Sequence, residues 1–153
     1  MGEVARACRE EGGEILGVIT SHLAALEVAF DGCDDLVVVG SMRERKKIMV
    51  DEGDAFVVLP GGLGTYEELF ETLVGRVLSE HDKPIAILND HGYFDPLVSM
   101  IDHGIEHRFI RQAAGDLLTV HTDPTEIIDA ILSDQGHGHQ PSDLIPPLSS
   151  PRE

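Results

Sequence analysis

Glycine and threonine residues crowd into the run 60–68, which reads Pro-Gly-Gly-Leu-Gly-Thr-Tyr-Glu-Glu. The run follows the apolar stretch 55–59 and precedes apolar residues with helical spacing, so it is predicted to join a buried strand to a helix. Glycines let backbone N–H groups approach a ligand closely, and the start of a helix adds unpaired N–H groups and the positive end of the helix dipole. We therefore predict a phosphate site at this turn, built from Gly61, Gly62, Gly64 and Thr65.

Glu68 ends this run, and a catalytic carboxylate beside the predicted phosphate site is one interpretation of it. A structural alternative stands beside this role, because Thr65 and Glu68 also fit the T-x-x-E capping box of a helix start. The run lacks the lysine of a Walker A sequence and the spacing of the dinucleotide fingerprint, so backbone groups are expected to hold the phosphate.

The chain is acidic, with a formal net charge of −17, so a phosphate site must be positive locally. Four of the eleven basic residues lie in the run 43–47. A capping box at 41–44 predicts a helix over 42–52. On that helix Arg45 falls on the apolar, inward side and Lys46 at its edge, and a buried guanidinium needs a carboxylate or a phosphate as its partner. A solvated helix face is the alternative interpretation of the run.

Length and composition exclude several classes of protein. The 153 residues are enough for one domain with a core of its own. No apolar run approaches membrane-spanning length and the first residues lack an apolar signal core, so we expect a cytoplasmic protein with no membrane segment. The negative charge argues against nucleic acid as a partner. The two cysteines have no metal-type spacing and are expected to be reduced.

Two groups of histidines could suggest a metal site, and we assign none to either. Residues 103–107 read His-Gly-Ile-Glu-His and match the H-x-x-E-H pattern of some zinc proteases, but a glycine interrupts the helix and no third ligand is evident. His137 and His139 lie in a glycine-rich tail that lacks the preorganisation of a site. The sequence therefore predicts neither a metal nor another cofactor.

Strands alternate with helices along the chain. Apolar runs predict strands at 14–19, 36–39, 55–59, 84–88 and 117–120. Helical spacing and caps predict helices at 3–11, 42–52, 66–80, 94–107 and 124–132. This alternation predicts an α/β fold in which a parallel sheet is covered by helices on both faces, in a single domain over 1–134. Residues 135–153 are rich in Gly, Pro, Ser and His and are predicted to be a disordered tail.

The motifs of this chain resemble those of the LONELY GUY (LOG) family of cytokinin-activating phosphoribohydrolases. The specific signal is the pair Met-x-Glu-Arg-Lys at 42–46 and Pro-Gly-Gly-x-Gly-Thr-x-x-Glu at 60–68, in this order and spacing. His-Asp-Lys-Pro at 81–84 and Gly-Tyr-Phe-Asp at 92–95 continue the similarity, which extends over residues 1 to about 132.

The resemblance implies a Rossmann-like fold, a homodimer and an activity. Members hydrolyse the N-glycosidic bond of adenosine 5′-monophosphate (AMP) or its N6-modified forms and release the base and ribose 5-phosphate, without a cofactor. Carried onto this sequence, the catalytic pair is Arg45 and Glu68. Met42 and Lys46 join the glycine run among the nucleotide-binding residues.

The sequence departs from the family in two places. Met1 and Gly2 align with the end of a glycine-rich loop, so about 30 residues, one strand-helix-strand unit, are absent relative to the family. We expect Met1 to be an internal methionine taken as a start, or the chain to be a truncated form. Many members carry a tryptophan in the helix after the glutamate motif, whereas this chain has none, so the base is left open between adenine and N6-prenylated adenine.

Other functions remain as alternatives at this stage. Proteins with this glycine motif have often been labelled lysine decarboxylases, but none of Lys46, Lys47 or Lys83 has a setting that suggests a Schiff base. A stronger rival is a non-catalytic nucleotide- or cofactor-binding module, like the molybdenum-cofactor carriers that share this fold. An inactive fragment is the third alternative.

Overall fold

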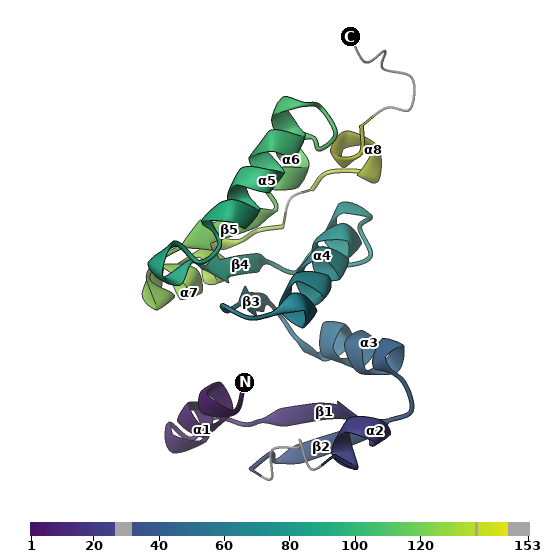
Figure 1. Ribbon diagram of the computed structural model, residues 1–153, viewed down its shortest axis with the longest axis vertical. Coiled ribbons are helices and arrows are strands. Elements are labelled where there is room, and N and C mark those ends of the chain that lie inside the picture. Colours follow the sequence, from purple (N-terminus) through teal and green to yellow (C-terminus); the bar gives the residue numbers. More distant parts are fainter. Residues whose placement is uncertain (27–31, 137, 147–153) are drawn as a thin grey trace. The chain divides into compact units, whose positions relative to one another are not determined.

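The computed structural model describes residues 1–26, 32–136 and 138–146 (Figure 1). It divides into two compact units, Met1–Gly53 and Asp54–Glu153, which are called unit 1 and unit 2 below and are described separately. Every strand pair in the described ranges is parallel. None of the helices in these ranges has the length and apolar character that spanning a bilayer requires.

Unit 1 is a pair of parallel strands with the helices that precede, join and follow them. Its elements are α1 (Gly2–Glu10), β1 (Leu16–Thr20), α2 (Ser21–Ala24), β2 (Asp35–Val39) and α3 (Met42–Glu52). The Asp34 carboxylate stabilises the start of the strand pair. It accepts hydrogen bonds from the Ile15 N–H at 2.8 Å and from the Arg9 guanidinium at 2.7 Å. The Ile15 N–H and then Arg9 hold the pKa of Asp34 below its usual value.

Helix α3 has the bounds that the sequence predicts. The Ser41 hydroxyl accepts a hydrogen bond from the Glu44 N–H at 3.2 Å, as an N-cap should. The Glu44 carboxylate reaches back to the N–H of Gly40, at 3.1 Å, one residue further than in a regular capping box. Gly53 follows the last turn. Both ends of α3 are therefore fixed by local chemistry.

Unit 2 holds a three-stranded parallel sheet in the order β3-β4-β5. Its elements are β3 (Phe56–Val58), α4 (Leu63–Val77), β4 (Ile85–Leu88), η1 (Asp90–Gly92), α5 (Asp95–Glu106), α6 (Gln112–Gly115), β5 (Leu118–His121), α7 (Pro124–Ser133) and α8 (Pro141–Leu144). Because the strands are parallel, the segments that leave β3 and β4 at their carboxyl ends emerge at the same edge of the sheet.

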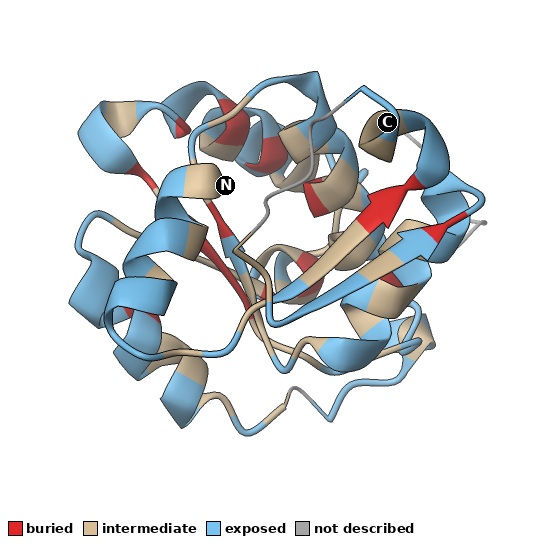
Figure 2. Ribbon diagram, turned by 90° about the horizontal axis from the view of Figure 1, so that it is seen from below, coloured by how far each residue is buried: buried red, intermediate tan, exposed pale blue. Residues whose placement is uncertain are grey.

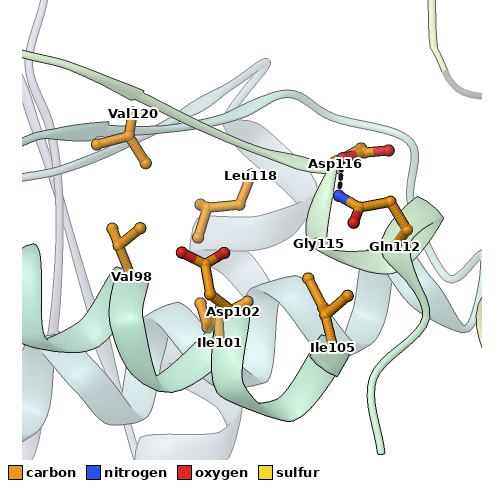
Figure 3. Close-up of a pocket in the computed structure, with 9 residues that line it drawn as sticks. All are labelled: Val98, Ile101, Asp102, Ile105, Gln112, Gly115, Asp116, Leu118 and Val120. Carbon is orange, nitrogen blue, oxygen red and sulfur yellow. Dashed lines mark hydrogen bonds between the residues drawn. The ribbon is translucent and has the colours of Figure 1, made fainter. Parts of the chain in front are cut away.

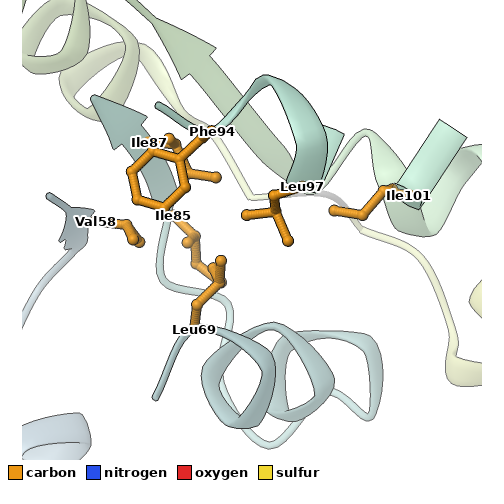
Figure 4. Close-up of a cluster of buried hydrophobic side chains, with 7 residues drawn as sticks. All are labelled: Val58, Leu69, Ile85, Ile87, Phe94, Leu97 and Ile101. Atoms are coloured by element: carbon orange, nitrogen blue, oxygen red, sulfur yellow. The ribbon is translucent and has the colours of Figure 1, made fainter. Parts of the chain in front are cut away.

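The core of unit 2 lies between the sheet, α4 and α5 (Figure 4). Its buried side chains are Val58, Leu69, Ile85, Ile87, Phe94, Leu97 and Ile101. Phe94 is fully buried, and Figure 4 shows its ring beside Ile87. In Figure 2 the buried residues are concentrated on strands and on one side of helices, whose other sides are exposed. This core fixes where α4 begins and where the turn after β4 lies.

The α/β fold with parallel strands flanked by helices is confirmed, and the described residues form two sheets, one in each unit. A single domain over 1–134 stays a prediction. The four-residue helices α2, α6 and α8 are absent from the prediction. Helix α8 falls in the range predicted to be disordered, and its Leu144, 1% exposed, packs with Leu117 and Ala114. His137 and residues 147–153 lie outside the described residues.

Candidate active site

The glycine run forms the start of helix α4. The helix begins at Leu63, three residues earlier than predicted, with Gly62 as its N-cap. The N–H groups of Thr65 and Tyr66 both bond to the Gly62 carbonyl, at 3.0 and 3.4 Å. The N–H groups of Gly62, Leu63 and Gly64 precede the first intrahelical bonds, so they are the donors that this helix end presents to an anion.

The reason for a glycine differs among the three positions of the turn. A side chain at Gly61 would collide with the Thr65 hydroxyl, so this position must be glycine for the turn to close against the helix. A Cβ at Gly62 or Gly64 would meet no atom within 4 Å among the described residues, and neither residue has a positive φ. Packing within the chain therefore does not require glycine at 62 or 64. Close approach of a ligand to the backbone is the reason that remains.

Glu68 lies in the second turn of α4 and is half-buried. It follows Gly64 by four residues and Thr65 by three, so all three share one face of the helix. Helical side chains lean toward the N-terminus, which brings the Glu68 carboxylate back toward the phosphate-binding turn. The capping box predicted for Thr65 and Glu68 is wrong, because the N-cap is Gly62 and Thr65 already lies inside the helix. The catalytic role of Glu68 stays a prediction.

The predicted basic site residues lie in unit 1, on helix α3. Arg45 is half-buried; its Nε donates to the Val18 carbonyl of β1 at 3.0 Å, and a terminal nitrogen lies 3.4 Å from the Met42 sulfur. Lys46 is also half-buried, whereas Lys47 is exposed and pairs with Asp51 at 2.6 Å. The structure therefore brings Met42 and Arg45 together and anchors the guanidinium against β1.

The predicted site residues thus fall into two groups, one in each unit. Met42, Arg45 and Lys46 share α3, and the glycines, Thr65 and Glu68 share the start of α4. Pairing between Arg45 and Glu68 stays a prediction, since the two residues belong to different units.

Sequence reasoning missed one neighbour of the glycine turn. The Tyr93 hydroxyl donates a hydrogen bond to the Gly61 carbonyl at 2.5 Å. Tyr93 belongs to the Gly-Tyr-Phe-Asp motif at 92–95, which the resemblance includes without giving it a role. The parallel pairing of β3 and β4 was the signal available, because it predicts that the segments following these strands meet.

A cavity of about 200 Å³ lies elsewhere in unit 2, between α5, α6 and β5 (Figure 3). Apolar side chains such as Val98, Leu118 and Val120 line it together with Asp102 and Asp116, and Asp116 accepts a hydrogen bond from Gln112 at 2.8 Å. No residue of the glycine turn or of α4 takes part. Two carboxylates disfavour a phosphate, so this cavity is not the predicted anion site.

The two histidines of the H-x-x-E-H pattern lie at the end of α5. Their rings, of His103 and His107, meet edge to face with centroids 4.2 Å apart, and both residues are exposed. Across residues 1–26, 32–136 and 138–146 no three His, Cys, Asp or Glu side chains gather in a way that could hold a metal ion.

Comparisons with known proteins agree with the motifs. A family model described as "Possible lysine decarboxylase" matches residues 1–131. A probable cytokinin riboside 5′-monophosphate phosphoribohydrolase of Oryza sativa subsp. japonica is 38% identical over 131 residues, which are 86% of this chain and 54% of that protein. Cytokinin riboside 5′-monophosphate phosphoribohydrolases of Rhodococcoides fascians and Mycobacterium tuberculosis are each 42% identical, over 87% and 78% of this chain and 68% and 64% of their own lengths. The chain thus spans about half the length of the rice relative and about two thirds of the bacterial ones.

Proposed function

The chain belongs to the LONELY GUY family of cytokinin riboside 5′-monophosphate phosphoribohydrolases, and we propose that it binds AMP or an N6-modified AMP and hydrolyses its N-glycosidic bond. The products are the free base and ribose 5-phosphate. The observation that carries this proposal is the start of α4, where a glycine turn that can receive a phosphate lies one helical turn before Glu68.

The phosphate of the substrate binds at the start of α4. The N–H groups of Gly62, Leu63 and Gly64 donate to its oxygens, and the Thr65 hydroxyl adds a side-chain donor. A helix start favours an anion by about 0.3–1 kcal/mol through its dipole alone, so the hydrogen bonds must supply most of the affinity. The chain carries a net charge of −17, so an anion site must be positive locally. Arg45 and Lys46 stay predicted nucleotide-binding residues, as the resemblance implies.

Glu68 acts on the ribose end of the substrate. As the bond between C1′ and the base nitrogen breaks, its electron pair leaves with the base and positive charge develops on the sugar ring. The Glu68 carboxylate stabilises this charge and accepts a proton from the water whose oxygen bonds to C1′. The departing base takes up a proton from solvent. Water is the second reactant, and the step changes no oxidation state.

A single glycine tests the phosphate contact without disturbing the fold. Gly64→Ala places a methyl group where no described atom lies within 4 Å, at a helical position where alanine is favoured over glycine by up to about 1 kcal/mol. We expect the melting temperature to stay constant or rise. The methyl group leans toward the helix start and obstructs the phosphate, so AMP should bind at least about tenfold more weakly, the effect of losing one charged hydrogen bond.

Titration calorimetry with AMP and with adenosine measures this effect. Adenosine lacks the phosphate, so its weaker binding should be the same for Gly64→Ala and the unaltered chain. Gly40→Ala, in unit 1, is the control, because Gly40 has no positive φ and a Cβ there would touch only the Glu44 carboxylate, at 3.9 Å. Gly12→Ala is not suitable because Gly12 has a positive φ. Equal AMP affinity in Gly64→Ala and the unaltered chain would contradict the phosphate assignment.

The substrate's base, the oligomer and the compartment stay predictions. Adenine and N6-prenylated adenine are both compatible with the residues described above. The homodimer and the cytoplasmic location come from the resemblance and from the sequence. Exposed apolar side chains on α7, such as Ile128 and Leu132, are compatible with a surface that contacts another copy.

A further inference from the structure

The turn between β4 and α5 is held in one conformation by several independent contacts. His91 and Gly92 both have positive φ angles, 50° and 72°, which an unsupported chain rarely adopts at a histidine. The buried Asn89 side chain closes the turn, since its carbonyl accepts from the Phe94 N–H and its amide donates to the Asp95 carboxylate, both at 2.7 Å. These contacts therefore hold the backbone at Tyr93 in a fixed position, because Tyr93 lies between Asn89 and its partner Phe94.

The Tyr93 side chain extends from this support to the start of α4. Its hydroxyl donates to the Gly61 carbonyl at 2.5 Å. Its ring meets the fully buried Phe94 ring edge to face, with centroids 4.9 Å apart and planes at 90°. A hydrogen bond with Tyr93, together with burial, raises the pKa of Tyr66, the residue after Thr65 in the first turn of α4. Tyr93 therefore contacts both the glycine turn and the helix that follows it.

The bond to the Gly61 carbonyl fixes the direction of the next N–H group. In a trans peptide the carbonyl of one residue and the N–H of the next point in opposite directions. With the Gly61 carbonyl directed at Tyr93, the Gly62 N–H is directed away from the turn after β4. A peptide between two glycines rotates more freely than any other, so its orientation depends on such an external contact.

We propose that Tyr93 is a positioning residue for the phosphate, which holds the peptide between Gly61 and Gly62 so that the Gly62 N–H faces the bound anion. The proposal rests on the function proposed above. Tyr93 acts through the peptide between Gly61 and Gly62 and not on the reacting bond, so it contributes to substrate binding and leaves the chemical step unchanged.

Tyr93→Phe tests the proposal, because it removes the hydroxyl and keeps the ring on Phe94. We expect KM for AMP to rise about fivefold to tenfold, the effect of one misdirected hydrogen bond to a charged group, with kcat within twofold of the original and an unchanged melting temperature. A residue that only supported the fold would lower the melting temperature and kcat together. Tyr66→Phe is the matched control: it leaves the bond to Gly61 in place and should change KM by less than twofold.

A second readout follows the Gly62 N–H directly. In ¹H–¹⁵N spectra, AMP should shift the Gly62 amide signal of the unaltered chain and shift it less in Tyr93→Phe at equal saturation. Hydrolysis of AMP by the unaltered chain with an equal KM in Tyr93→Phe would overturn the role of Tyr93 alone. If the unaltered chain neither binds nor hydrolyses AMP, the proposed function fails and the positioning role fails with it.

Discussion

Glu68→Gln is expected to lower kcat for release of adenine from AMP by about 10³-fold, within the 10²–10⁴ range of a positioned acid–base group. Glutamine has the same shape but carries no negative charge to stabilise the sugar cation, and it cannot accept the proton of the attacking water. AMP affinity should change by less than about threefold, because the phosphate is held by backbone groups of the preceding turn. Initial rates and calorimetry on the same preparation measure both quantities.

Glu67→Gln is the matched control for this experiment. Glu67 is the neighbouring residue on α4, and Glu67→Gln is the same chemical change. Glu67 is exposed and lies about 100° around the helix from Glu68. Its kcat should stay within twofold of the original. A Glu68→Gln variant that retains more than a tenth of the original kcat would assign the catalytic carboxylate elsewhere.

Arg76→Met is expected to lower the free energy of unfolding by about 3–5 kcal/mol, as measured when one partner of a buried ion pair is removed. Arg76, on α4, is 3% exposed. Its guanidinium donates twice to Asp134 at the end of α7, at 2.9 and 3.1 Å, and once to the Leu117 carbonyl at 3.0 Å. Methionine fills a similar volume but leaves the Asp134 carboxylate and the Leu117 carbonyl without this donor.

Urea unfolding followed by circular dichroism gives the free energy of unfolding for this comparison. Arg43→Met makes the same change at an exposed position of α3 and should shift the value by less than about 0.5 kcal/mol. If the free energy of unfolding of Arg76→Met falls by less than about 1 kcal/mol, the contact of Arg76 with Asp134 does not hold α4 and α7 together. Asp134→Asn, which keeps the shape of the partner, should lose stability in the same direction.

The parts of the fold with local causes were predictable. Helix α3 has its predicted bounds because Ser41 caps it and Gly53 follows it, two signals within the segment itself. Helix α4 was placed three residues too late because its cap is the backbone of Gly62, which resembles a loop residue in the sequence. Helices of four residues, such as α8, are too short to show a period, so only their packing reveals them.

In the candidate site, too, only the features with local causes could be predicted. The glycine turn at a helix start could be predicted because the two are adjacent in the sequence, and phosphate binding there stays a prediction. A parallel sheet predicts that the segments after β3 and β4 meet, but not the particular hydrogen bond of Tyr93 with Gly61, 32 positions away. The contact of Arg76 with Asp134, 58 positions away, had no signal in the sequence. The burial of Arg76 has no local signal in the sequence either, because the carboxylate that pairs with it lies 58 positions away.

The most direct test of the central claim is a chromatographic analysis of the products formed from AMP. The incubation is run with the chain of residues 1–153 and with the same chain extended by any residues that its gene encodes before Met1. We predict adenine and ribose 5-phosphate in equal amounts, and their loss in Glu68→Gln. AMP that stays intact with both chains, or that yields adenosine and inorganic phosphate, would contradict it.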